Sequence, residues 1–305
     1  MQNQLWLPQD RKNLSSETLK KAKDVLDIIP QLSLYVQKII EMAKDENVDS
    51  NKLSEVASSD PVLASKILMM VNSTYYGLSH KTDNLRLAIV LLGFDEVRNI
   101  AVQCGVMQTM GKIGGDGAYD TKQLWRHSYL VSVCAEMLLK NDDPKHKGVL
   151  MTMGILHDIG KFALNNISLM SAKKTNKPVA MINKSADTRL LESEEKIFGL
   201  NHAIIGCMLA EKWNLSGRIR DVIEYHHFPS FFGVNDINSE YIEDISTICL
   251  ADFIVNRIME GQEGLREPHQ YFFDVLGLEP PIDNLITEET KSKLTAASEN
   301  IDNLV

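Results

Sequence analysis

The sequence of 305 residues predicts an all-α protein. It holds 17 glycines and 9 prolines, which is less than the combined share of roughly 12% that is usual for these helix-interrupting residues. Apolar residues recur three and four positions apart along most of the chain, as on the buried face of a helix. No segment between turn residues alternates apolar and polar side chains in the way that a half-buried strand does.

Capping residues and helix breakers place the helices of the first third of the chain. Ser15 or Ser16 can cap a helix that runs to about Asp27 and stops before Pro30. Asp60 can cap another helix, because Pro61 is tolerated at the first helical position. Further helices are expected over residues 32–42, over 85–92 up to Gly93, and over 96–110. A shorter helix is expected to begin at a cap at Ser50, and residues 72–80 are expected to form a polar turn.

Residues 111–120 contain four glycines and form the clearest interior linker. We therefore expect an N-terminal helical extension over 1–28, a helical subdomain over 29–113, a second helical subdomain over 114–261 and a C-terminal tail over 262–305. Helices in the second half are expected at 121–139, 147–164, 190–198, 201–213, 217–227 and 242–259, with helical segments in the tail near 269–276 and 288–299.

Charge and composition exclude several classes of protein. The net charge of −9 argues against a dominant nucleic-acid interaction, which needs a basic face, but permits a small anionic ligand. No apolar stretch approaches the roughly 18 residues of a membrane span, and the first residues do not resemble a secretory signal, so we expect a cytoplasmic protein. The four cysteines form no CxxC pair and are expected as reduced core residues: Cys104, Cys134, Cys207 and Cys249.

Titratable residues interrupt apolar helix faces in the second half of the chain, where an unpaired buried charge would be costly. His226 and His227 end the apolar stripe of Ile219, Val222 and Ile223. The other titratable residues of this kind are His127 and Asp252 within apolar stripes, His202 at the start of a helix, and His157 and Asp158 at the end of the apolar run 149–156.

Each of these residues alone has a simpler explanation. A single histidine on an apolar face is usually a hydrogen-bonded core residue, and Asp252 alone could pair with an arginine. Five histidines and two aspartates on inner faces of neighbouring helices indicate instead a shared site for first-row metals such as Fe, Mn or Zn. By contrast, His80, His146 and His269 lie in polar, loop-like surroundings and are expected at the surface.

Several segments resemble known families. His157-Asp158, followed by Ile159, Gly160 and Lys161, resembles the HD-domain signature, and the order of the seven residues resembles the ligand series of HD-GYP-type phosphohydrolases. Upstream, residues 29–33, 58–78 and 85–102 resemble the HDOD family, the HD-related output domain. Matches on both sides of the linker, in this order, are more specific evidence for the resemblance than an HD dipeptide alone.

The resemblance implies an HD-like helical core behind its own N-terminal helical subdomain, and a signalling or regulatory role in bacteria. It implies two divalent metal ions, with Fe or Mn preferred over Zn, Ni or Mg. By similarity, one metal is held by His127, His157, Asp158 and Asp252, and the second by His202, His226 and His227, with Asp158 bridging. Many family members have lost ligands, whereas all seven positions are filled here.

Two functions remain open at this point. The first is a regulatory module that binds metal, a nucleotide or other small phosphorylated ligand, and a protein partner in a signalling pathway. The alternative is a metal-dependent phosphohydrolase with Asp158 and Lys161 as catalytic residues, in which Lys161 meets a phosphate oxygen unless it is a solvent-facing lysine. Phe228, Pro229 and Ser230 stand where HD-GYP proteins continue with Asp-Gly-x-Gly-Tyr-Pro, which argues against cyclic di-GMP hydrolysis.

Overall fold

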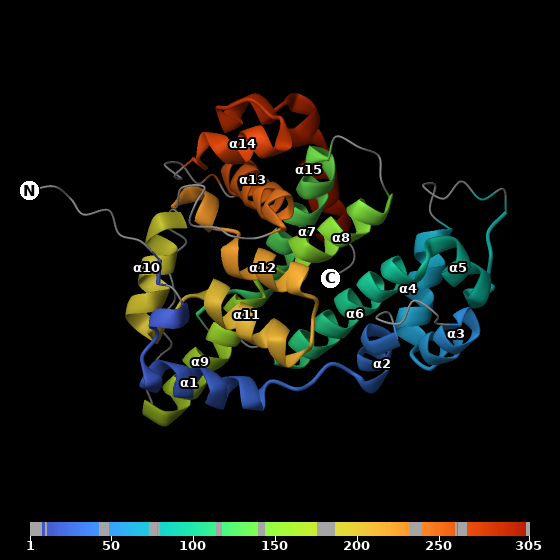
Figure 1. Cartoon of the computed structure of the whole chain (residues 1–305), viewed down its shortest axis with the longest axis horizontal. Helices are drawn as coiled ribbons and strands as arrows, with labels where there is room; N and C mark the ends of the chain where they lie inside the picture. Colours follow the sequence, from blue (N-terminus) through green and yellow to red (C-terminus); the bar gives the residue numbers. More distant parts are fainter. Residues whose placement is uncertain are drawn as a thin grey trace, which may run out of the picture. The chain divides into compact units, whose positions relative to one another are not determined.

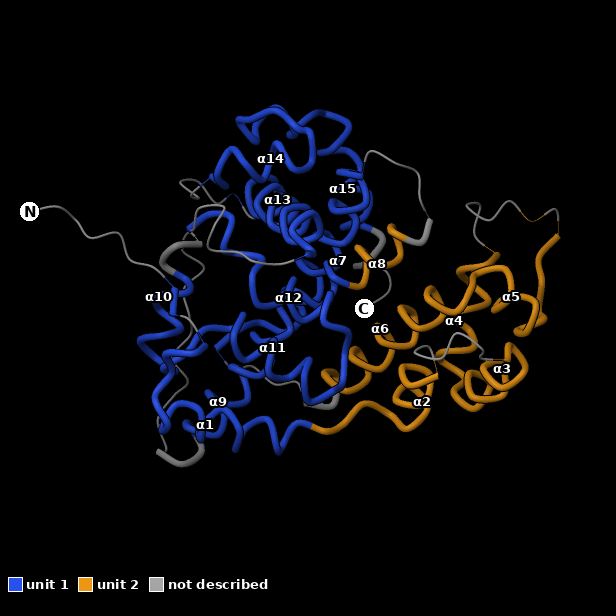
Figure 2. The backbone as a smooth tube through the Cα atoms, viewed as in Figure 1, with its two compact units in different colours: residues 1–29, 114–142, 153–305 blue, residues 30–113, 143–152 orange. Residues whose placement is uncertain are grey.

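The structure is a computed structural model that describes residues 8–9, 11–42, 49–72, 78, 80–113, 118–139, 144–175, 187–231, 240–259, 261 and 267–302. All regular elements in these ranges are helices, which confirms the predicted all-α class (Figure 1). The chain forms two compact units (Figure 2): unit 1 comprises Met1–Ile29, Gly114–Asp142 and Met153–Val305, and unit 2 comprises Pro30–Ile113 and Asp143–Thr152. Within the described ranges, no helix is long and apolar enough to cross a membrane.

Unit 2 is built from helices around a shared apolar core. Its elements are α2 (Leu34–Met42), α3 (Ser50–Ser58), α4 (Pro61–Val71), α5 (Leu85–Leu92), α6 (Phe94–Ile113) and most of α8 (Pro144–Leu156). Ile39, Leu63 and Ile89 from three of these helices are fully buried in the core.

Local capping explains where the helices of unit 2 begin and end. The Asp60 carboxylate accepts the backbone N–H groups of Val62 and Leu63 at 3.0 and 3.1 Å, so it caps α4 as predicted. Gly93 ends α5 with a φ of 81°, a conformation that favours glycine. The cap predicted at Ser50 is wrong, because Asp49 accepts from the N–H of Asn51 and Ser50 is already helical. The turn predicted at 72–80 lies largely outside the described residues.

Unit 1 contains the helices that surround the predicted site. They are α1 (Ser16–Ile28), α7 (Thr121–Leu138), the end of α8, α9 (Ile159–Thr175), α10 (Asp187–Phe198), α11 (His202–Lys212), α12 (Gly217–Tyr225), α13 (Ile242–Met259), α14 (Gln270–Leu276) and α15 (Glu288–Asp302). Helix α7 packs on α13, and α11 packs between α9 and α12. The first helix and the last two belong to the same unit, because α1 contacts α9 and α11, α14 contacts α13, and α15 contacts α7 and α13.

Two predicted helices differ from the structure near the histidines. The helix predicted over 147–164 is wrong, because the chain turns at His157 and Asp158 between α8 and α9. Within this turn the N–H of Lys161 donates to the carbonyl of Asp158 at 2.9 Å. The helix predicted over 217–227 ends at Tyr225, so both histidines of that segment follow the helix. The four cysteines are buried and free, as predicted.

Two glycines allow α9 and α11 to approach each other closely. A Cβ at Gly160 would lie 1.8 Å from the carbonyl oxygen of His202 and 2.8 Å from the backbone nitrogen of Gly206. A Cβ at Gly206 would lie 2.9 Å from a methyl group of Ile223. This backbone contact holds the His157-Asp158 turn, which immediately precedes α9, against the first residue of α11.

We expect Gly160→Ala to lower the free energy of unfolding by about 3 kcal/mol, because its methyl group must displace helix backbone and not a flexible side chain. Gly111→Ala is the matched control: it is also a helical glycine, and its Cβ would meet no atom within 4 Å. The control should leave stability unchanged or raise it by up to about 1 kcal/mol. Thermal unfolding followed by circular dichroism measures both changes, and equal midpoints for the two variants would contradict the close packing described here.

Candidate metal centre

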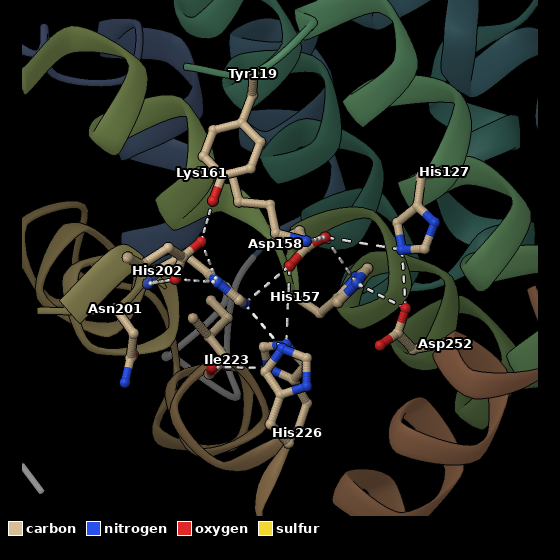
Figure 3. A network of polar contacts seen from close by, with 12 residues as sticks. Tyr119, His127, His157, Asp158, Lys161, Asn201, His202, Ile223, His226 and Asp252 are labelled. Carbon is tan, nitrogen blue, oxygen red and sulfur yellow. Dashed lines mark hydrogen bonds and ion pairs between the residues drawn. The ribbon is translucent and has the colours of Figure 1, made fainter. Parts of the chain in front are cut away.

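The structure brings the seven predicted ligands of unit 1 to one place (Figure 3). They are contributed by α7 (His127), the α8–α9 turn (His157 and Asp158), the start of α11 (His202), the residues directly after α12 (His226 and His227) and α13 (Asp252). All seven residues are buried, and none exposes more than 7% of its total surface. Residues as far apart in sequence as His127 and Asp252 are therefore neighbours in a single interior cluster.

Potential ligand atoms fall into two groups that share one residue. His127, His157 and Asp158 form the first group, and Asp158 joins the second group with His202, His226 and His227. Within each group the ligand atoms lie within 4.8 Å of one another. Asp252 adjoins the first group, since its Oδ1 lies 2.9 Å from Nε2 of His127 and 3.9 Å from Nε2 of His157.

The two oxygens of Asp158 face different groups. Its Oδ2 lies 3.4 Å from Nε2 of His157 and 3.7 Å from Nε2 of His127. Its Oδ1 lies 3.1 Å from Nε2 of His202 and 3.8 Å from Nε2 of His226. A carboxylate in this position can contribute one oxygen to each of two neighbouring cations, which lowers the repulsion between them.

Outer hydrogen bonds turn three imidazole rings toward the centre. Nδ1 of His157 lies 2.7 Å from the carbonyl oxygen of Gly154, and Nδ1 of His226 lies 2.9 Å from that of Ile223. Nδ1 of His202 lies 2.8 Å from a carboxylate oxygen of Glu194. Because Nδ1 is occupied on each ring, Nε2 is the atom presented to a ligand, which is the usual arrangement in metal sites.

The donor atoms of the centre fit a divalent metal. Nε2 of His157 and Nε2 of His226 are buried and have no hydrogen-bond partner among the described residues. Buried polar atoms without a partner are costly and uncommon in folded proteins. Imidazole nitrogen combined with carboxylate oxygen is a donor set that first-row transition metals accept.

Lys161 is buried beside the shared carboxylate and is not a solvent-facing lysine. Its Nζ lies 2.5 Å from Oδ2 of Asp158. Burial by itself would raise the pKa of Asp158, but the positive charges of Lys161 and the nearby imidazoles outweigh this effect and hold that pKa well below its usual range. The Lys161 ammonium thus neutralises part of the negative charge of the centre.

Two residues of this centre were not predicted from the sequence, Glu194 and Tyr119. Glu194 lies on α10 with its side chain fully buried, and it accepts hydrogen bonds from Nδ1 of His202 and from the Tyr119 hydroxyl. Burial lowers the pKa of His202, but the carboxylates of Glu194 and Asp158 together outweigh this effect and raise that pKa to about 9. Glu194 shares a helix face with Leu191, so the same search for titratable residues on apolar faces could have found it. Tyr119 falls in the segment 111–120 that was expected only as a linker.

Comparison with known proteins first gives a family match. The sequence profile of the HDOD domain matches residues 29–229. A protein from Treponema pallidum (strain Nichols), described as uncharacterized, is 24% identical over 253 residues, which cover 82% of this chain and 47% of that protein. The chain therefore spans about half the length of this curated relative.

Solved structures share the fold at low sequence identity. An HDOD domain protein of unknown function from Geobacter sulfurreducens is 20% identical, with a TM-score of 0.64 over 95% of this chain and 98% of that one. A Marinobacter aquaeolei VT8 protein, named for a proposed role in signal transduction, is 19% identical, with a TM-score of 0.64 over 94% of this chain and 66% of that one. A Shewanella amazonensis SB2B protein, named as a proposed metal-dependent phosphohydrolase, is 20% identical, with a TM-score of 0.62 over 92% of this chain and 96% of that one. Because the family profile matches more than half of the sequence, this chain belongs to the HDOD domain family.

Proposed function

We propose that this chain is a regulatory HDOD module whose histidine and aspartate centre binds two divalent metal ions. The observation that carries the proposal is the position of Asp158, whose two oxygens face two separate groups of buried imidazoles. One carboxylate between two such groups is suited to a pair of cations. In this proposal a protein partner in a signalling pathway, and a nucleotide or other small phosphorylated ligand, act together with the metal-loaded module.

The proposed ligands of the first metal are His127, His157, Asp158 and Asp252, and those of the second are Asp158, His202, His226 and His227. Five imidazoles with two carboxylates suit first-row metals such as Fe or Mn better than Mg, because Mg prefers a coordination sphere made of oxygen. When bound, such ions polarise a phosphoryl oxygen and lower the pKa of water. The residues of the chain orient the donors and neutralise charge, as Lys161 does at Asp158.

Burial of the centre supports a regulatory role over turnover. His157, His202 and His226 are completely buried, and His127 and Asp252 expose only 7% and 6% of their surfaces. Such a centre retains a cation well but offers little room for a bulky phosphoester to enter and leave. A signalling partner is supported by the name of the Marinobacter aquaeolei protein, which shares the fold.

A second candidate function is metal-dependent hydrolysis of a phosphoester, such as a nucleotide. The observation that favours it is the ammonium group of Lys161, which stands inside the centre and could pair with a phosphoryl oxygen. Lys161, His127 and Asp252 also form its least buried side, with 9%, 7% and 6% exposed. A small phosphate group would approach on that side. The name of the Shewanella amazonensis protein points to the same class of reaction.

Metal content tests the first proposal. The full chain, prepared with Mn²⁺ and then freed of loosely bound ions, is expected to retain about two equivalents by elemental analysis, because two groups of donors are present. Asp158→Asn should retain less than one, since it removes the charge that both groups share. His80→Ala is the control, because His80 is exposed and belongs to neither group of donors. A wild-type chain that retains no metal under these conditions rules out the proposed centre.

Turnover separates the two functions. We expect the Mn²⁺-loaded wild type to leave nucleotides, cyclic dinucleotides and simple phosphoesters intact when substrates and products are separated by chromatography, because the residues of the centre are almost completely buried. Hydrolysis of any of these substrates that disappears in His157→Ala would establish the hydrolase in place of the regulatory module. Lys161→Met is tested in the same assay. Lower turnover with unchanged metal content would show that the Lys161 ammonium acts on the substrate and not on the metal.

A further inference from the structure

Glu194 stands out because it is fully buried and its carboxylate is directed at one of the proposed ligands. We propose that Glu194 is a positioning residue that sets the affinity of the second group, Asp158, His202, His226 and His227, for its cation. This inference rests on the proposed metal centre. It assigns to Glu194 the orientation of His202, a ligand of the second group.

The need for Glu194 follows from where His202 lies in its helix. His157 and His226 each place Nδ1 against the carbonyl oxygen three residues earlier, which the preceding helical turn supplies. His202 is the first residue of α11 and follows the cap Asn201, so no helical turn precedes it. The acceptor for its Nδ1 must therefore come from another element, and α10 provides it through Glu194.

The contact with Glu194 fixes the ring relative to its own backbone. Oε2 of Glu194 lies 2.8 Å from Nδ1 of His202 and also accepts the backbone N–H of His202 at 2.8 Å. Oε1 lies 2.9 Å from the same Nδ1. Holding both the ring and the main chain of one residue leaves little rotational freedom, so Nε2 stays 3.1 Å from Oδ1 of Asp158. A carboxylate partner also strengthens the imidazole as a metal ligand.

Tyr119 in turn fixes the carboxylate of Glu194. The Tyr119 hydroxyl donates to Oε1 of Glu194. The backbone of Tyr119 is itself held by the side chain of Asn165 on α9, which accepts its N–H at 2.6 Å and donates to its carbonyl at 3.0 Å. The ligand His202 is thus oriented by a buried chain of contacts that starts on α9.

The experiment compares the full-length wild type with Glu194→Gln. Glutamine has the same shape, but its single carbonyl oxygen cannot serve the ring, the backbone N–H and the Tyr119 hydroxyl together. Each protein is titrated with Co²⁺, and both the binding isotherm and the visible absorption of the bound ion are recorded. We expect one of the two equivalents to bind about 10- to 100-fold more weakly in Glu194→Gln, with a changed spectrum, while the other keeps its affinity.

Two further variants distinguish positioning from packing. Tyr119→Phe should weaken the same equivalent by a smaller factor, because it frees the carboxylate without removing it. Glu192→Gln is the matched control on the same helix, where Glu192 pairs with Lys196 at the surface, and it should bind both equivalents like the wild type. Unfolding midpoints of the metal-free proteins show whether a variant has simply lost stability.

The possible results separate the two proposals. Wild-type affinity and spectrum for both equivalents in Glu194→Gln would overturn the role of Glu194 while leaving the metal centre intact. Equal weakening of both equivalents, together with a lowered unfolding midpoint, would also overturn it, since that is the effect of lost packing. A wild-type chain that binds no Co²⁺ would overturn the metal centre and, with it, this inference.

Discussion

The arrangement of unit 1 depends on one buried negative charge, the carboxylate of Asp158. Only 1% of this residue is exposed, and an isolated carboxylate at that depth would be strongly destabilising. Lys161, His157 and His202 surround it and make the charge tolerable. Those partners come from the α8–α9 turn, the first turn of α9 and the start of α11, so satisfying this one group requires the helices to meet as they do.

The close approach of α9 and α11 serves the same requirement. Gly160 and Gly206 remove the side chains that would separate these helices, which lets the turn carrying Asp158 lie against His202. The bidentate ion pair of Arg218 with Asp244, at 2.5 and 2.8 Å, links α12 to α13. These helices carry or precede the remaining ligands His226, His227 and Asp252. Interactions outside the centre thus determine the positions of its donors.

Much of the fold and most of the centre could be predicted from the sequence, since both rest on local signals. Asp60 with Pro61 and the break at Gly93 define helix ends directly, and histidines on apolar faces stand out against their neighbours. The turn at His157 and Asp158 could not be predicted, because apolar residues continue on both sides and neither residue is a helix breaker. Glu194 could have been found on the apolar face that it shares with Leu191, but its pairing with His202 could not, because the turn at Gly199, whose φ is 83°, separates the two residues and helical periodicity does not connect them.

Helix α8 belongs to both units, with Pro144–Thr152 in unit 2 and Met153–Leu156 in unit 1. Its last residue is followed at once by His157, whose backbone N–H still donates to the carbonyl of Met153 at 2.8 Å. A helix is stiff along its axis, because each turn is hydrogen-bonded to the next. Consequently, the position and orientation of His157 in the centre follow those of the last turn of α8, Met153–Leu156, through the main chain alone.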